Sequence, residues 1–307
     1  MREQVVLTPS EPVMLGHYRL LAELGSGGMA NVYLAVEDGA RAPSDLVVLK
    51  VLRAELAGDR DLVEMFLQEA RLASRLVHRN VVETFEADQV AGRHVIIMEY
   101  LDGESLGHIL ERARDSGPPI SLETHLRILS ECLNGLHYAH ELCDLAGKPL
   151  ELVHRDVSPH NVFVTFAGRV KVLDFGIAKA IGSVVTTQAG TIKGKVRYMG
   201  PEQFAGEKLD RRADIFAVGC LLWDAAAGQR MWGRKGDVEI WKRVVHGVIP
   251  SPSTVNADVP PALEAIVRRA LAKKRDDRFP TCLAMKGELD AFLARRGGRP
   301  GLYVIGA

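Results

Sequence analysis

The chain has no excess of charge of either sign and no long apolar run. Lys and Arg together number 39, as do Asp and Glu, so the net charge is zero and no general field attracts nucleic acid or an anionic membrane. The longest apolar stretch runs from Ile215 to Trp223, stops at Asp224 and is too short to cross a bilayer. Residues 1–4 do not begin the pattern of a signal peptide. We therefore expect a cytoplasmic protein with no membrane segment and no nucleic-acid partner.

Cysteine is also scarce. The spacings of the four cysteines fit neither a zinc site nor a dense disulfide framework. Three of them lie in apolar, helix-like stretches, which predicts buried free thiols in a reducing compartment. The four are Cys132, Cys143, Cys220 and Cys282.

The pattern of apolar residues divides the chain into two regions. From residue 17 to about 101 it predicts strands at 20–23, 32–36, 46–52, 81–87 and 94–100, with one helix at about 59–77. From about 102 to 296 it predicts helices at 105–114, 121–143, 210–227, 237–246, 262–273 and 282–295. Residues 1–16 are expected to be a flexible lead-in and residues 297–307 a linker-like tail. The sequence thus predicts an α+β protein with a small five-stranded N-lobe and a larger, mostly helical C-lobe.

Two charged residues in the N-lobe lie where apolar residues are expected. Lys50 sits inside the apolar run from Leu46 to Leu52, where a lysine needs a buried anion. On the following helix, the apolar stripe that includes Phe66 also contains Glu69, which needs a buried cation. We predict that Lys50 and Glu69 form an ion pair. A purely stabilising role is the alternative, although buried pairs stabilise proteins poorly.

Two short motifs in the C-lobe carry the strongest chemical signal. The first is Val153-His154-Arg155-Asp156-Val157-Ser158-Pro159-His160-Asn161, and the second is Asp174-Phe175-Gly176. Each motif alone is more often an ordinary loop or turn. In this order and at this spacing, Asp156 can accept a hydroxyl proton while Asn161 and Asp174 supply oxygen ligands to Mg²⁺. The pair of motifs therefore indicates a phosphoryl-transfer site.

At these positions the chain resembles the eukaryotic-type protein kinases, whose catalytic loop reads H-R-D-L-x-x-x-N and whose metal-binding turn reads D-F-G. The stretches Gly27-Gly28-Met29-Ala30 and Met199-Gly200-Pro201-Glu202-Gln203 are most similar to bacterial kinases of this type, in particular a myxobacterial-like group. The resemblance runs from about residue 17 to 296. It implies the two-lobed protein kinase fold, with an antiparallel N-lobe sheet, and binding of ATP and Mg²⁺.

The resemblance also assigns residues to the nucleotide. Backbone N–H groups of the glycine-rich turn approach the phosphates, Lys50 and Glu69 position the phosphates, and Asn161 and Asp174 hold the metal. The third glycine of the family pattern is replaced by Ala30, and Val48 stands where the family has Ala. The residues assigned to the nucleotide are Leu24, Gly25, Gly27, Gly28, Val32, Val48, Lys50, Met98, Glu99, Leu101, Phe163 and Asp174.

The segment from Asp174 to Glu202 resembles an activation segment. Its phosphosite candidates are Thr186, Thr187 and Thr191, and the resemblance implies that a phosphate there is clamped by Arg155. Solvated, unmodified threonines are the alternative. The resemblance gives scaffold roles to Asp214, which holds the catalytic-loop backbone, and to Arg278, which pairs with Glu202.

The chain departs from the family at two catalytic positions. Ser158 stands where the family's Ser/Thr kinases have a lysine that touches the γ-phosphate, and Lys195 stands where they have a threonine. The two positions face each other across the phosphate in the family fold. We therefore expect that the cation and the hydroxyl have exchanged places.

The sequence is thus interpreted as a kinase that phosphorylates Ser or Thr residues of protein substrates. Pro159 follows the Ser/Thr form of the catalytic loop and not the tyrosine form. A pseudokinase that binds ATP or acts as a scaffold is the alternative, since it would account for the changes at Ser158 and Lys195. A small-molecule kinase is a third option, but such enzymes generally lack the segment that ends in Gly200-Pro201-Glu202. Dimerisation through the N-lobe stays open, although nothing in the sequence supports it.

Overall fold

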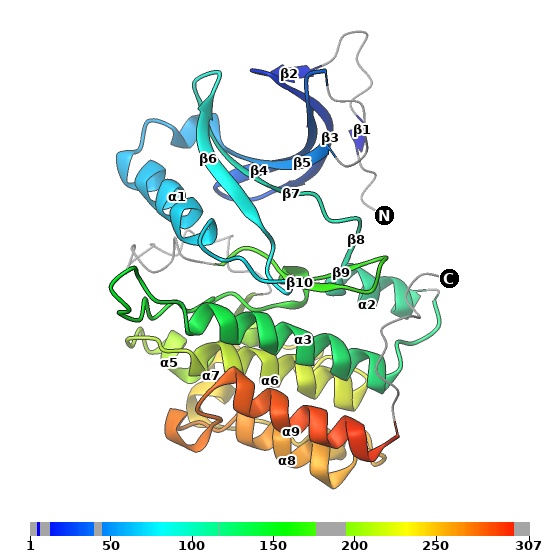
Figure 1. Cartoon of the computed structure of the whole chain (residues 1–307). Helices are drawn as coiled ribbons and strands as arrows, with labels where there is room; N and C mark the ends of the chain where they lie inside the picture. Colours follow the sequence, from blue (N-terminus) through cyan, green and yellow to red (C-terminus); the bar gives the residue numbers. More distant parts are fainter. Residues whose placement is uncertain (1–4, 7–12, 40–44, 116, 176–194, 298–307) are drawn as a thin grey trace. The chain divides into compact units, whose positions relative to one another are not determined.

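The computed structural model describes residues 5–6, 13–39, 45–115, 117–175 and 195–297 (Figure 1). These residues form two compact units. The first comprises the described residues up to 77 together with 82–101, and the second comprises 78–81, 102–175 and 195–297. Within the described ranges, no helix is both long enough and apolar enough to span a membrane.

The first unit is an antiparallel sheet with one long helix. Seven strands can be described in it, in the order β1-β3-β4-β5-β7-β6, with β2 also paired to β3. The strands are β1 Val5–Val6, β2 Val13–Leu15, β3 Tyr18–Ser26, β4 Ala30–Glu37, β5 Leu46–Leu52, β6 Thr84–Val90 and β7 Arg93–Glu99. The helix α1, Arg60–Ala73, begins where the Asp59 side chain accepts hydrogen bonds from the Asp61 and Leu62 N–H groups.

Three details of this unit differ from the prediction. Residues 5–6 and 13–15, expected to be part of a flexible lead-in, form strands β1 and β2. β2 can pair back onto β3 because Gly16, at φ +58°, makes the tight turn between them. β6 begins at Thr84 and not at Val81, because Val81 forms a parallel bridge with Val172 of the second unit.

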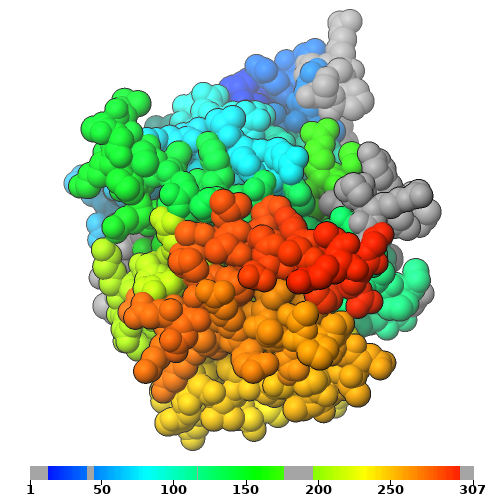
Figure 2. All heavy atoms as spheres, turned by 60° about the horizontal axis from the view of Figure 1, so that its bottom comes forward, coloured from blue at the N-terminus to red at the C-terminus, as the bar shows by residue number. Residues whose placement is uncertain are grey.

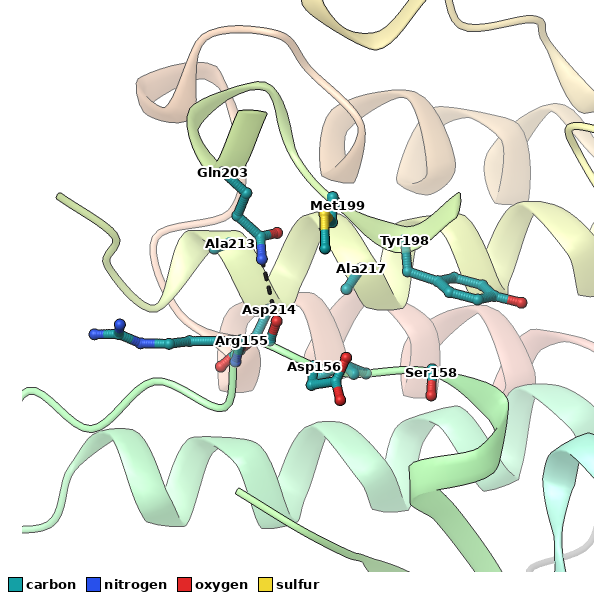
Figure 3. A pocket seen from close by; sticks show the side chains of 10 residues that line it. Arg155, Asp156, Ser158, Tyr198, Met199, Gln203, Ala213, Asp214 and Ala217 are labelled. Atoms are coloured by element: carbon teal, nitrogen blue, oxygen red, sulfur yellow. Dashed lines mark hydrogen bonds between the residues drawn. The ribbon is translucent and has the colours of Figure 1, made fainter. Parts of the chain in front are cut away.

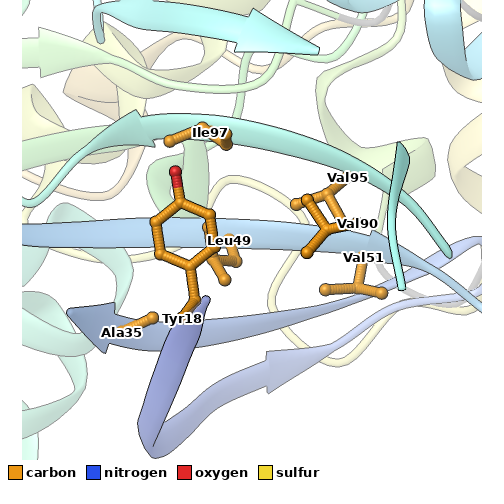
Figure 4. Close-up of a cluster of buried hydrophobic side chains, with 7 residues drawn as sticks. All are labelled: Tyr18, Ala35, Leu49, Val51, Val90, Val95 and Ile97. Atoms are coloured by element: carbon orange, nitrogen blue, oxygen red, sulfur yellow. The ribbon is translucent and has the colours of Figure 1, made fainter. Parts of the chain in front are cut away.

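Two clusters of apolar side chains hold the first unit together, one on each face of the sheet. Figure 4 shows the first, which consists of Tyr18, Ala35, Leu49, Val51, Val90, Val95 and Ile97. In the second, Leu52 of β5 packs with Phe66 and Ala70 of α1. Because side chains alternate along a strand, Lys50 shares the face of Leu52 and points to the side of the sheet that carries α1.

The second unit is mostly helical, with a small sheet of order β10-β9-β8. Helix α6 is buried along most of its length and lies against α3 and α8. Figure 2 shows α9 in red next to α8 in orange on one face of this unit. The elements are β8 Gly103–Ser105, α2 Leu106–Asp115, α3 Leu122–His140, β9 Val162–Thr165, β10 Val170–Val172, α5 Pro201–Phe204, α6 Arg212–Ala227, α7 Asp237–His246, α8 Pro261–Ala270 and α9 Cys282–Arg295.

The short segment 78–81 belongs to the second unit although the chain on both sides of it belongs to the first. Most contacts of this segment with the rest of the second unit are made by Asn80. Its Nδ2 donates to the Val170 carbonyl and to Glu131 Oε2, both at 2.9 Å, and its carbonyl accepts from the Val172 N–H at 2.8 Å. Lys171 Nζ donates to the Val81 carbonyl at 3.1 Å. The segment is thus built into the second unit through β10.

None of the four cysteines forms a disulfide, and three of them are buried, in agreement with the prediction of buried thiols. Cys132, Cys220 and Cys282 are buried, and Cys143 is exposed. Burial raises the pKa of the Cys132 thiol to about 12, so this thiol stays protonated at neutral pH.

Candidate active site

The first unit contains the predicted ion pair. Lys50 Nζ lies 2.7 Å from Glu69 Oε1, and the two side chains are 15% and 12% exposed. β5 supplies the lysine and α1 the glutamate, and the packing of Leu52 against Phe66 and Ala70 brings these two elements together. The pairing of Lys50 with Glu69 is confirmed, while its role toward a nucleotide stays a prediction.

The glycine-rich turn joins β3 to β4. It is closed by the Gly27 N–H, which donates to the Ala30 carbonyl at 2.9 Å, and by Ser26 Oγ, which donates to Asn31 Oδ1 at 2.8 Å. A Cβ atom added at Gly25 would meet nothing within 4 Å, and one added at Gly27 would only touch the Ala30 carbonyl, at 3.4 Å. Internal packing therefore does not require glycine at either position. Close approach of a ligand to the backbone would require it.

Sheet register places three of the other predicted nucleotide residues of this unit opposite partners from the same set. In β4 and β5, Val32 is opposite Lys50, and in β5 and β7, Val48 is opposite Met98. Glu99 ends β7, and its Oε1 accepts the Glu83 N–H at 2.7 Å. Leu24, which is 38% exposed, lies on β3, Gly28 lies in the turn, and Leu101 follows β7.

In the second unit, a buried aspartate holds the loop that carries Asp156. Asp214 lies on α6, and its carboxylate accepts the N–H groups of His154 and Arg155, both at 2.8 Å. His140 Nε2 donates to the same carboxylate at 2.7 Å. Burial by itself raises the pKa of Asp214, but the hydrogen bond and charge of His140 and the contacts with His154 bring that pKa below its usual value. The predicted scaffold role of Asp214 is confirmed.

His154 connects this loop to the turn that carries Asp174. Its Nε2 donates to the Leu173 carbonyl at 2.8 Å, so its Nδ1 is the atom that accepts the Asp156 N–H, at 3.3 Å. The imidazole is completely buried and lies against the Phe175 ring, with ring centroids 4.7 Å apart. His154 and Phe175 thus pack against each other, and His154 also holds the backbone of the proposed base.

Backbone strain gathers at the same place. Within the described ranges, four residues other than glycine have positive φ angles, and two of them are Arg155 at 67° and Asp174 at 46°. Such conformations cost about 1–3 kcal/mol each and are kept where the surrounding structure imposes them, commonly at active sites. Arg155 is half-buried; burial lowers the pKa of its guanidinium, and the nearby Asp214 carboxylate opposes this change.

Asn161 and Asp174 have the chemistry expected of a magnesium site. Asn161 Nδ2 donates to the Asp156 carbonyl at 2.8 Å, which fixes the amide and leaves its Oδ1 as an oxygen donor for a cation. The Asp174 carboxylate belongs to an exposed residue. In the described part of the chain, no three His, Cys, Asp or Glu side chains gather to hold a metal by themselves. Two protein oxygens are nevertheless enough for Mg²⁺, which usually completes its shell with water and substrate phosphates. The residues therefore fit this ion.

Ser158 and Asp156 line one pocket of the second unit, together with Arg155, Tyr198, Met199, Gln203 and α6 (Figure 3). The backbone of Lys195 begins a short 3₁₀ helix, Lys195–Tyr198, whose last residue lines this pocket. The Lys195 side chain lies outside the described part of the structure, so the predicted swap with Ser158 stays a prediction.

Thr186, Thr187 and Thr191 lie outside the described residues. Phe163 lies on β9, the central strand of the small sheet.

The second predicted ion pair is also formed. Arg278 donates to both carboxylate oxygens of Glu202, at 2.7 and 2.8 Å, and both side chains are buried. Gln203, the next residue, has no role predicted from the sequence. Its position, three residues after Gly200 at the start of a helix, is one that a helix-capping pattern would have drawn attention to.

The family described as "Protein kinase domain" matches residues 18–288. Among curated proteins, the chain is 42% identical to the tyrosine-protein kinase MasK of Myxococcus xanthus, over 95% of this chain and 45% of that protein. It is 36% identical to the serine/threonine-protein kinase Pkn1 of the same species, over 95% of this chain and 41% of that protein.

Two further comparisons extend this similarity. The chain is 32% identical to the serine/threonine-protein kinase PrkC of Bacillus subtilis, over 89% of this chain and 40% of that protein. It therefore spans less than half the length of these three relatives. The crystal structure of the Mycobacterium tuberculosis PknI kinase domain matches with a TM-score of 0.67 and 27% identity, over 92% of this chain and 99% of that one.

Proposed function

The chain belongs to the protein kinase domain family and to its bacterial, eukaryotic-type branch, and on that premise we propose that it transfers the γ-phosphoryl group of ATP to serine or threonine hydroxyls of protein substrates. The observation that carries the proposal is the ion pair between Lys50 and Glu69. The two side chains keep 15% and 12% exposure, so the pair can still meet a ligand, and an ion pair of this kind adds little stability by itself, which favours a functional use.

Each proposed catalytic residue has a defined task. Lys50, oriented by Glu69, anchors the phosphates, and the backbone of the glycine-rich turn approaches them. Asp156 orients the substrate hydroxyl and accepts its proton. Asn161 and Asp174 hold Mg²⁺, which when bound neutralises charge on the phosphates. Catalysis then depends on positioning and charge stabilisation, because the protein forms no covalent bond to the phosphoryl group.

Tyrosine is the second candidate acceptor, since the relative with 42% identity is named a tyrosine-protein kinase. Serine or threonine is the better supported choice, because Pro159 has the Ser/Thr form and because Pkn1 and PrkC are named serine/threonine-protein kinases. Peptide mass spectrometry of a generic basic protein after incubation with the chain and Mg-ATP separates the two. Phosphotyrosine as the main product would replace the proposal by the second candidate.

The same incubation tests whether the chain is an enzyme or an ATP-binding pseudokinase. Intact-mass measurement of the chain and of the acceptor protein should find added phosphate that depends on Mg-ATP and disappears in Lys50→Met. A folded wild-type chain that binds ATP and adds no phosphate to itself or to any acceptor would support the pseudokinase.

We further propose that autophosphorylation between Asp174 and Glu202 regulates the activity. The cytoplasmic location remains a prediction from the sequence.

A further inference from the structure

The backbone of Arg155, the residue before the proposed base, is held on both sides. Arg155 has the left-handed φ of 67°, which a residue with a side chain adopts only when its surroundings impose it. Its N–H donates to Asp214 Oδ1 at 2.8 Å, and its carbonyl accepts Gln203 Nε2 at 3.1 Å. The carbonyl of Arg155 and the N–H of Asp156 belong to one peptide plane. The contact with Gln203 therefore bears directly on the backbone from which Asp156 projects.

The other end of the Gln203 amide binds the start of its own helix. The Gly200 N–H donates to Gln203 Oε1 at 3.0 Å, where Gly200 is the N-cap of α5. One side chain thus ties the end of the proposed activation segment to the catalytic loop. An amide can do this because it carries a donor and an acceptor, whereas a carboxylate carries acceptors only.

We propose that Gln203 is a positioning residue for phosphoryl transfer: its amide holds the Arg155 carbonyl and thereby the backbone of Asp156. Gln203 itself need not touch a substrate. The proposal rests on the proposed kinase activity and specifies how the base is kept in place. The competing explanation is that Gln203 only caps α5, a role in which glutamate is as good as glutamine.

Gln203→Glu distinguishes the two explanations. The carboxylate keeps an acceptor for the Gly200 N–H but has no donor, and it places negative charge against the Arg155 carbonyl oxygen. In Figure 3 the Arg155 guanidinium extends away from Gln203, so it does not offer the new carboxylate a ready partner. If Gln203 only caps α5, Gln203→Glu should transfer phosphate at the wild-type rate. If Gln203 positions the Asp156 backbone, Gln203→Glu should transfer phosphate more slowly.

The first readout is steady-state transfer to a generic basic protein with Mg-ATP. Gln203→Glu and Gln203→Met should each lower kcat about tenfold and change the KM for ATP less than about twofold, because a small misplacement of a reacting group impairs the chemical step. Gln229→Glu, at an exposed glutamine of the same unit, is the matched control and should behave as wild type. Wild-type kcat in Gln203→Glu would overturn the proposal.

The pH dependence of the ratio between variant and wild type adds a signature that a structural defect would not produce. Once protonated, the introduced carboxyl can donate to the Arg155 carbonyl and accept from Gly200 again, so the ratio for Gln203→Glu should rise as the pH falls. The ratio for Gln203→Met should stay flat. Arg155, Asp156, Asp214 and Tyr198 line the same pocket, and α7 packs on α5. These groups are common to all the proteins compared, so a pH dependence found in Gln203→Glu and not in Gln203→Met reports on the introduced carboxyl. A flat ratio for Gln203→Glu would contradict the proposal.

The second readout needs no activity. Amide hydrogen exchange, followed by mass spectrometry, should be faster in peptides covering residues 153–161 of Gln203→Glu than of wild type, and unchanged there in Gln229→Glu. Unchanged exchange in all variants would overturn the proposal even if the wild type is active. If wild type transfers no phosphate, the proposed function fails, and the exchange rates still decide whether Gln203 holds this loop.

Discussion

The two units each contain an ion pair that the sequence predicted, and the pairs differ in how their groups are surrounded. In the second unit, the side chains of Arg278 and Glu202 are 0% and 3% exposed. The guanidinium binds both carboxylate oxygens, and its remaining N–H groups reach backbone carbonyls of Ala272, Arg212 and Lys273. In the first unit, Lys50 and Glu69 keep 15% and 12% exposure, and a lysine is a point charge without a fixed fork.

The difference indicates what each pair is for. A buried, bidentate pair whose donors are all used inside the protein has nothing left to offer a ligand, so Glu202 and Arg278 act as scaffold. A pair that keeps contact with solvent, and whose lysine lies opposite Val32 on the strand that follows the glycine-rich turn, is suited to meet a phosphate. Loss of the Arg278–Glu202 pair should therefore lower the stability of the fold, and loss of the Lys50–Glu69 pair should lower the rate of phosphate transfer.

The largest effect is expected from the reacting groups. Lys50→Met, Asp174→Ala and Asp156→Asn should each lower phosphate transfer by at least about 10³-fold, since each removes a group that acts directly on the phosphates, the metal or the acceptor hydroxyl. Urea unfolding of Lys50→Met should show a loss of less than about 2 kcal/mol, because its pair is partly solvated. Near-wild-type turnover of any of the three, in a folded protein, would remove that residue from its role.

The scaffold pair should give the opposite result. Arg278→Met leaves the Glu202 carboxylate buried without its partner and should lower the free energy of unfolding by about 3–5 kcal/mol. Adding Glu202→Gln should recover part of that loss. Arg275→Met is the matched control, because Arg275 pairs with Glu207 at the surface and the expected cost is less than about 1 kcal/mol. If Arg278→Met and Arg275→Met lowered the free energy of unfolding equally, the distinction between the buried pair and the surface pair would be wrong.

The predicted swap of the hydroxyl and the cation between positions 158 and 195 implies that the second unit also supplies a cation, Lys195, to the phosphate. Lys195→Thr should lower kcat by about 10²-fold, and Ser158→Lys should also lower it by crowding two cations. The double variant restores the family arrangement and should recover much of the loss, with a coupling energy above about 1 kcal/mol. Lys208→Thr, at an exposed lysine of the same unit, should have no effect. Additive losses would mean that the two positions do not share the phosphate.

The smallest expected effect concerns the activation segment. Autophosphorylation should map to Thr186, Thr187 or Thr191, and the triple alanine variant should lose roughly tenfold in activity, about the value of one charge-assisted hydrogen bond to Arg155. Peptide mass spectrometry of the active chain locates the phosphate. Phosphate found only outside residues 174–202, or full activity of the triple variant, would count against this regulation.

The sequence allowed the prediction of features that depend on residue type in a local pattern. The apolar run of β5 around Lys50 and the stripe of α1 around Glu69 require each other, because neither charge can be buried alone. The spacing of the Asp156 loop and the Asp174 turn predicted that they act together, and the hydrogen bond from His154 to the Leu173 carbonyl joins them, while their catalytic role stays a prediction. In the same way, the resemblance at Asp214 and Arg278 led to contacts that the structure contains.

Features that depend on a partner distant in the sequence could not be predicted. The strand β2 exists because the edge of β3 is available to it, and Val81 leaves β6 because Val172 binds it. Gln203 has no pattern of its own beyond the helix cap, since a half-exposed amide is common at protein surfaces. Its contact with the Arg155 carbonyl depends on where the fold brings residue 155, some 48 positions away.

The segment 78–81 has a consequence for how the chain acquires its structure during synthesis. Asn80 and Val81 find their partners at Val170, Lys171 and Val172, which leave the ribosome about 90 residues later. At translation rates of roughly 5–20 residues per second, this stretch waits several seconds for them. A nascent chain halted near residue 101 would hold every strand of the first unit and still lack the partners of Asn80. The two units are therefore not separable products of translation, and a gene cut between them should yield a first half with unmet hydrogen bonds.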